Sequence, residues 1–160
     1  ASSMIPNIID QIEANAITYG EKKVLQPRIC KVGDKIWYSI GGGINKAVQI
    51  DSQGWRVVET GLPFFRELSN TRSQVLPTNV DADAKILLDF VNISDEGHKL
   101  LFLVTAITCF IPGIEHPSMV FHGSKGAAKT TAMEMLKRIV DPSIEKPASL
   151  PRNNFDFGLL

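Results

Sequence analysis

The stretch between residues 122 and 131 has the composition of a phosphate-binding loop. It runs His-Gly-Ser-Lys-Gly-Ala-Ala-Lys-Thr-Thr, in which small residues precede a lysine and two threonines. The spacing of Gly123, Lys129 and Thr130 matches the template GxxxxGK[ST], whose backbone N–H groups surround a polyphosphate. A helical pattern follows the loop directly, so the positive end of a helix dipole would face the same phosphates. The sequence therefore predicts a nucleoside triphosphate site over Gly123–Thr131.

The side chains of this loop are expected to take different parts of the triphosphate. Lys129 would reach the β- and γ-phosphates and is the expected catalytic residue, while the Thr130 hydroxyl would bind Mg²⁺. Thr131 adds a contact near the α-phosphate, and Lys125 either contacts a phosphate oxygen or points into solvent. The residues expected to bind ATP are Gly123, Ser124, Lys125, Gly126, Ala127, Ala128, Lys129, Thr130 and Thr131.

One position departs from the template. Ala128 stands where the template has its second glycine, and Gly126 is an additional glycine inside the loop. A Cβ atom is tolerated at position 128 only if the local backbone dihedral angles are ordinary. The alternative interpretation is therefore a Gly/Ala-rich turn beside a surface lysine.

The elements that position the loop are predicted from hydrophobic periodicity. A short apolar run at Ser118–Phe121 predicts a buried strand before the loop, and helical spacing over residues 131–140 predicts a helix after it. Upstream, the apolar run Leu100–Ile111 predicts a buried helix whose N-cap is Ser94. This run is shorter than the roughly 20 residues that cross a bilayer, so no membrane partner is expected.

The first half of the chain has a different period. Helical spacing predicts an amphipathic helix over residues 5–18, and four β-rich runs between glycine turns predict an antiparallel meander. The expected fold class is α+β: a small antiparallel β meander with flanking helices, then the first strand–P-loop–helix unit of an α/β P-loop NTPase. The expected parts are an N-terminal helix (1–20), a β module (21–60), a connector (61–80), and a helical region with the start of the NTPase domain (81–160).

Composition limits the function classes. Of the 160 residues, 44% are hydrophobic and 21% charged, which is typical of a globular protein. Lys plus Arg and Asp plus Glu number 17 each, so a broad basic face for nucleic acid is not expected and any DNA contact must be local. Cys30 and Cys109 have no metal-binding or CxxC spacing, which fits a reducing, cytoplasmic location.

Other candidate sites are weaker. The run Gly41–Gly43 resembles a phosphate cradle, but β-rich runs on both sides favour a hairpin turn. A mixture of aromatic and basic residues resembles single-stranded nucleic-acid binding sites, although sheet core plus a solvated face explains it more simply. No histidine has metal-ligand spacing. The residues concerned are Trp37, Tyr38 and Trp55 with Lys35, Lys46 and Arg56, and the histidines His98, His116 and His122.

The sequence from Pro117 onward resembles a group of bacterial, archaeal and phage ATP-binding proteins linked to mobile elements. The resemblance is carried by Pro117–Gly123, by Gly126–Thr131 and by Leu136–Ser143, and it includes an alanine before the loop lysine. These proteins look like the helicase-type ATPase part of primase–helicases. The resemblance implies ATP and Mg²⁺ as cofactors, and DNA and further copies of the chain as partners. A looser similarity extends over the upstream β-rich runs.

The expected function is Mg-ATP binding, with hydrolysis in a longer protein that acts in DNA replication of a mobile element. Hydrolysis needs a carboxylate at the end of a second strand, and neither Glu145 nor Asp156 follows an apolar run. The chain is therefore expected to be an N-terminal fragment, inactive alone, that stops before this acid. Two alternatives stay open: a small-molecule phosphotransferase that uses the same loop, and a nucleic-acid or protein docking module with a vestigial loop.

Overall fold

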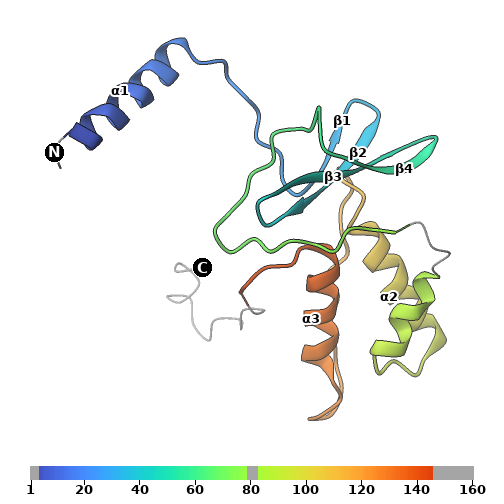
Figure 1. The fold of residues 1–160 in the computed structure, drawn as a ribbon. Coiled ribbons are helices and arrows are strands. Elements are labelled where there is room, and N and C mark those ends of the chain that lie inside the picture. The colour runs from blue at the N-terminus through green and yellow to red at the C-terminus, as the bar shows by residue number, and fades with distance from the viewer. Residues whose placement is uncertain (1–3, 79–82, 146–160) are drawn as a thin grey trace.

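The structure is a computed structural model that describes residues 4–78 and 83–145. It has α+β architecture, in which a four-stranded antiparallel sheet is combined with helices (Figure 1). This confirms the expected fold class at the level of sheet and helices. The elements are α1 (Met4–Tyr19), β1 (Ile29–Val32), β2 (Lys35–Gly41), β3 (Ile44–Asp51), β4 (Gly54–Val58), the 3₁₀ helix η1 (Ala84–Phe90), α2 (Glu96–Thr108) and α3 (Lys129–Val140).

The sheet is a meander in which each strand pairs with the next along the chain. Its order is β1-β2-β3-β4, and Tyr38 lies opposite Ile29 on one side and Val48 on the other. Glycines in the left-handed region form the turns, including Gly42 at φ +66°. A Cβ atom on Gly42 would lie 2.6 Å from the backbone nitrogen of Ser73 in the connector. The predicted meander and the predicted hairpin turn are therefore confirmed.

The two faces of the sheet are covered by different parts of the chain. On one face, Trp37 packs with Cys30 and Ala47. The connector covers this face with Leu62 and Phe65, and its backbone is held there by a bridge between Gln26 and Phe65. The connector is thus fixed to the sheet by tertiary contacts although it forms no helix or strand of its own over residues 61–78.

The other face of the sheet is turned toward the helices. The ring of Tyr38 lies 5.6 Å from that of Phe110, just after α2. A cavity of about 310 Å³ lies against this face of the sheet and is lined almost entirely by apolar side chains. These include Ile40 and Val48 from the sheet, and Ile139 from α3. This face therefore joins the β-rich half of the chain to the helical half.

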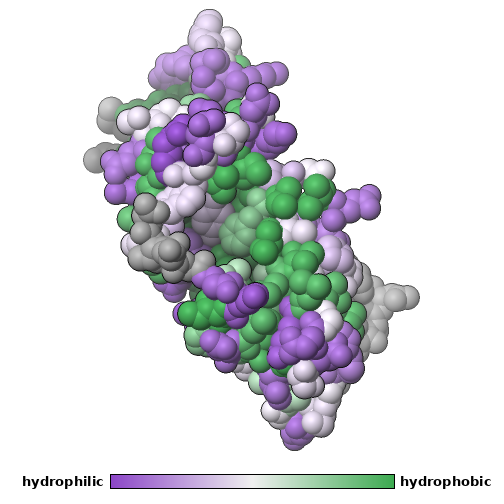
Figure 2. All heavy atoms as spheres, turned by 90° about the vertical axis from the view of Figure 1, so that its right-hand side faces the viewer, coloured by the Kyte–Doolittle hydropathy of each residue, from purple (hydrophilic) through white to green (hydrophobic). Residues whose placement is uncertain are grey.

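The expected burial of the helix in the apolar run Leu100–Ile111 is wrong. Only Phe102, Thr105 and Ala106 of α2 are buried, whereas Leu100 is 63% exposed. A helix with apolar residues all round can be buried only if neighbours surround it, and here one side has neighbours. Figure 2, which views the molecule from the right-hand side of Figure 1, where α2 lies, shows hydrophobic side chains spread over the surface. The cap of α2 is Asp95, whose Oδ1 accepts from the His98 N–H, rather than Ser94.

The strand predicted at Ser118–Phe121 is also wrong. These residues adopt no regular secondary structure, and Val120 is 81% exposed. A parallel strand needs a partner brought beside it by a crossover, and within residues 4–78 and 83–145 all four named strands belong to the meander. Without that partner, an apolar run has no ladder of hydrogen bonds to join.

The helices predicted at the two ends of the described chain are confirmed. The first covers Met4–Tyr19, and its residues 5–19 are all exposed. The second, α3, starts at Lys129 and ends at Val140, close to the predicted range. No helix in the described residues is both long and apolar enough to cross a membrane.

Candidate functional site

The candidate loop leads directly into α3. Residues 122–128 are irregular and the helix begins at Lys129, which is where the template requires it. Gly123 and Gly126 both lie in the left-handed region, with φ of +146° and +87°. Glycine adopts these conformations without steric cost, so the sequence allows the chain to bend sharply at both positions.

Ala128 adopts a left-handed backbone conformation. Its φ is +56° and its ψ is +24°, and in the described part of the chain it is the only residue other than glycine with positive φ. An L-residue in this region carries about 1–2 kcal/mol of steric strain. From the sequence we expected an alanine at position 128 to be tolerated only with ordinary backbone dihedral angles, and its observed angles are not ordinary. The loop keeps a glycine-type bend in spite of the alanine.

Lys129 bends back over the beginning of the loop. Its ammonium donates to the carbonyl oxygens of Gly123, at 3.0 Å, and of Ser124, at 2.8 Å. A further bond joins the Ala127 N–H to the Ser124 carbonyl at 3.3 Å. The end of the loop is therefore bonded to its beginning, and the positive charge of Lys129 lies beside the carbonyl groups of Gly123 and Ser124.

The amino end of α3 has no side-chain cap. Its N-cap residue is Ala128, which has no side-chain acceptor, and the first helical bond runs from Ala132 N–H to Ala128 C=O. The N–H groups before Ala132 have no partner within the helix. Together with the helix dipole, these N–H groups favour a bound anion.

The predicted site residues are only partly brought together. Ala127, Ala128 and Lys129 line a cavity of about 310 Å³ beside the start of α2. Thr131 instead lines a hollow on another side of α3, with Glu134 and Arg138. The remaining predicted residues, Gly123, Ser124, Lys125, Gly126 and Thr130, are exposed.

The cavity beside the loop includes polar residues that the sequence did not connect with it. Asp95, the N-cap of α2, and His98, in its first turn, line the cavity together with His122. The rings of His98 and His122 meet edge to face, with centroids 6.5 Å apart. The two histidines are far apart in sequence and share no motif, so sequence spacing left them isolated. In the described residues no three His, Cys, Asp or Glu side chains are grouped as metal ligands.

The aromatic and basic residues of the sheet do not form a common surface. Trp37 is buried in the core, whereas Trp55 is on the opposite face of the sheet and is 44% exposed. Two of the three basic side chains are paired: Lys46 with Glu59 at 2.7 Å, and Arg56 with Asp51 at 3.1 Å. This arrangement favours the interpretation as sheet core with a solvated face.

Comparison of the chain with protein-family models, with curated proteins and with solved structures finds no match. What the loop binds is therefore inferred from its residues and from its geometry. That geometry consists of two glycine bends, a left-handed alanine before α3, and a lysine folded over the loop carbonyls.

Proposed function

We propose that residues 123–130 bind the phosphates of Mg-ATP, as the nucleotide-binding loop of a P-loop ATPase. The observation that carries the proposal is that the Lys129 ammonium lies against the loop carbonyls of Gly123 and Ser124, while the amino end of α3 has no side-chain cap. A positive side chain and free N–H groups at one place are the requirements for holding a polyphosphate.

The exchange of partners at Lys129 explains how the loop could accept a phosphate. The ammonium now donates to two neutral carbonyl oxygens. Phosphate oxygens are charged acceptors and form stronger hydrogen bonds, so they can replace both carbonyls. Thr130 follows Lys129 in the first turn and is an exposed residue, and its hydroxyl is the group that we propose binds Mg²⁺.

The cellular role that we propose is in DNA replication of a mobile element, as a helicase-type ATPase. It is supported by the resemblance of the loop and of residues 136–143 to such proteins. The equal numbers of acidic and basic residues restrict any DNA contact to a local surface. Hydrolysis also requires a carboxylate that positions Mg²⁺ and water.

The proposal is tested by the affinity of the whole chain for a fluorescent ATP analogue in the presence of Mg²⁺. We expect Lys129→Ala to weaken binding by roughly 10- to 100-fold, because hydrogen bonds to charged groups contribute about 1.5–3 kcal/mol. Inorganic triphosphate should compete with the analogue, since the phosphates carry the recognition.

The matched control for this experiment is Lys22→Ala, which removes the same charge from an exposed position before the sheet. Its affinity should equal that of the unchanged chain. Equal affinities for Lys129→Ala and Lys22→Ala would contradict the proposal, as would a lack of any ATP binding by the unchanged chain.

A further inference from the structure

The carboxyl end of α3 is capped by side chains from distant parts of the chain. A helix leaves its last four carbonyl groups without helical partners. In α3, Lys137 C=O accepts from the backbone N–H of Asp141, at 2.8 Å. The other three accept from side chains: Gln74 Nε2 donates to Arg138 C=O at 3.1 Å and to Ile139 C=O at 2.8 Å, and Tyr38 Oη donates to Val140 C=O at 3.0 Å.

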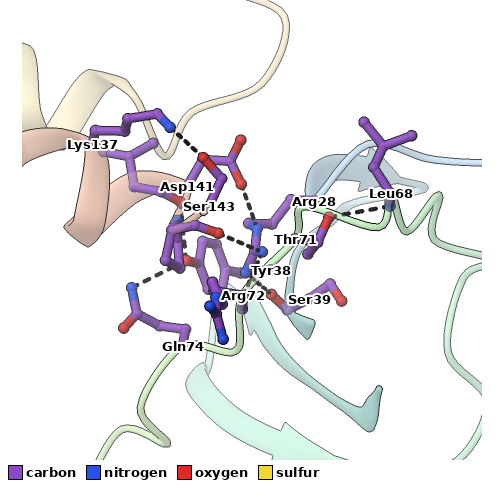
Figure 3. A network of polar contacts seen from close by, with 12 residues as sticks. Arg28, Tyr38, Ser39, Leu68, Thr71, Arg72, Gln74, Lys137, Asp141 and Ser143 are labelled. Atoms are coloured by element: carbon purple, nitrogen blue, oxygen red, sulfur yellow. Dashed lines mark hydrogen bonds and ion pairs between the residues drawn. The ribbon is translucent and has the colours of Figure 1, made fainter. Parts of the chain in front are cut away.

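Arg28 adds a charged contact just beyond the helix. Its Nε lies 2.7 Å from Asp141 Oδ1, and its side chain is only 9% exposed. The same guanidinium donates to Ile40 C=O in β2, at 3.1 Å, and to Arg72 C=O in the connector, at 2.8 Å (Figure 3). A positive charge at this end of a helix also interacts favourably with the helix dipole.

The donors in this cap are held firmly. Tyr38 belongs to β2, and burial raises the pKa of its phenol, so the group stays protonated and can donate. Gln74 is bonded to the sheet through its backbone N–H, which donates to the backbone C=O of Ile40 at 2.8 Å. Each donor is therefore attached to the sheet independently of α3.

Side-chain packing around α3 is partial, because several of its residues are half-buried and others are exposed. Ala132 is the only residue of the helix that is fully buried. A helix of 12 residues is a rod about 18 Å long. Because a rod moves as a unit, fixing its carboxyl end also fixes the direction of its amino end, where Lys129 and Thr130 lie.

We propose that Tyr38, Gln74 and Arg28 are positioning residues for the candidate phosphate-binding loop. They fasten α3 to the sheet, and through α3 they determine where Lys129 and Thr130 meet a phosphate group. This inference rests on the proposed function of the loop. It assigns the sheet a role in nucleotide affinity, although no residue of the sheet contacts the loop cavity.

The test combines Tyr38→Phe with Gln74→Met, which together remove the three side-chain hydrogen bonds to α3 and nearly preserve side-chain volume. We expect the affinity for the Mg²⁺-bound ATP analogue to fall by roughly 3- to 30-fold, the range for substitutions that act on a site through an intervening element. Hydrogen exchange without nucleotide should become faster at the amides of residues 132–136, near the loop. The matched control is Tyr19→Phe with Gln11→Met, on the exposed helix α1.

The outcomes separate this inference from the proposed function. If the unchanged chain does not bind ATP, the proposed function fails and the inference fails with it. If the unchanged chain binds and Lys129→Ala does not, unchanged affinity in the cap variant overturns the inference alone. A lower melting temperature with unchanged affinity and exchange would also overturn it, by showing a purely structural role. Should the double variant unfold, Tyr38→Phe alone, which removes one oxygen atom, decides the matter by the same two measurements.

Discussion

The two β-rich parts of the sequence behave differently in the structure. Between residues 29 and 58, every strand has its hydrogen-bonding partner one glycine turn away along the chain. The apolar run Ser118–Phe121 has no such neighbour, and among the described residues it joins no sheet. An apolar run thus predicts a strand reliably only when the same stretch of sequence also supplies the partner.

The same contrast appears in the burial of similar side chains. Ile40 in β2 is 0% exposed, whereas Val120 before the loop is 81% exposed. Both are β-branched and apolar, so their intrinsic preference for a strand is alike. The difference between them comes entirely from what lies around them.

The largest effect on stability is expected from truncating Ile40, and truncating Val120 is the comparison. Ile40→Ala should lower the free energy of unfolding by roughly 2–5 kcal/mol, because it removes a fully buried side chain. Val120→Ala should change it by less than about 0.5 kcal/mol, as is usual for exposed positions. Urea denaturation followed by circular dichroism measures both. Similar losses in the two variants would contradict the contrast between a packed sheet and an open segment.

A smaller effect is expected in the loop. Ala128→Gly should stabilise the protein by up to about 1 kcal/mol, because it relieves the strain of a left-handed alanine at some cost in chain entropy. Ala127→Gly is the matched control: its φ is not positive, so the same change should destabilise by about 0.4–1 kcal/mol. Thermal unfolding of both variants decides the sign. Destabilisation by Ala128→Gly would show that the glycine-type bend is absent.

The smallest effect concerns the two thiols. Burial raises the pKa of the Cys30 thiol in the sheet, whereas Cys109, after α2, is partly exposed. Because the thiolate is the reactive form, a thiol reagent at pH 8 should modify Cys109 quickly and Cys30 only after unfolding. The pKa of the Cys30 thiol is therefore higher in the folded protein than in the unfolded chain. Its contribution to the free energy of unfolding is fully present below the unfolded pKa and is lost as the pH rises through the folded pKa.

Labelling followed by mass spectrometry of peptides measures the two rates. Cys109→Ser should leave a folded protein that reacts slowly, and Cys30→Ser one that reacts at the rate of Cys109. Fast modification of Cys30 in the folded protein would show that the sheet core is open.

The parts of the fold that depend on local sequence could be predicted. Glycine turns and alternation indicated the four strands, and periodicity placed α3 to within two residues at its start. The exposure of much of α2 and of Val120 could not be predicted, because it depends on neighbours distant in sequence. The positions of the glycine bends in the loop followed from residue type, but the left-handed alanine did not.

The residues that surround the candidate site could not be predicted from sequence patterns either. Asp95 and His98 come to the loop through the packing of α2, and Tyr38 and Gln74 reach α3 through the fold of the sheet and connector. None of these residues shares a motif with the loop. Their role depends on tertiary contacts, which hydrophobic periodicity does not encode.

The tip of the β2–β3 hairpin offers a last consequence. Gly42 lies so close to the backbone of Ser73 that no larger residue fits without moving the connector, and the residue that follows is Gln74. Position 42 is thus restricted twice, by its left-handed backbone and by lack of space. A mutation at this exposed turn would be transmitted along one stretch of backbone to the far end of α3. A residue on the periphery of the molecule can in this way be as intolerant of change as one in its core.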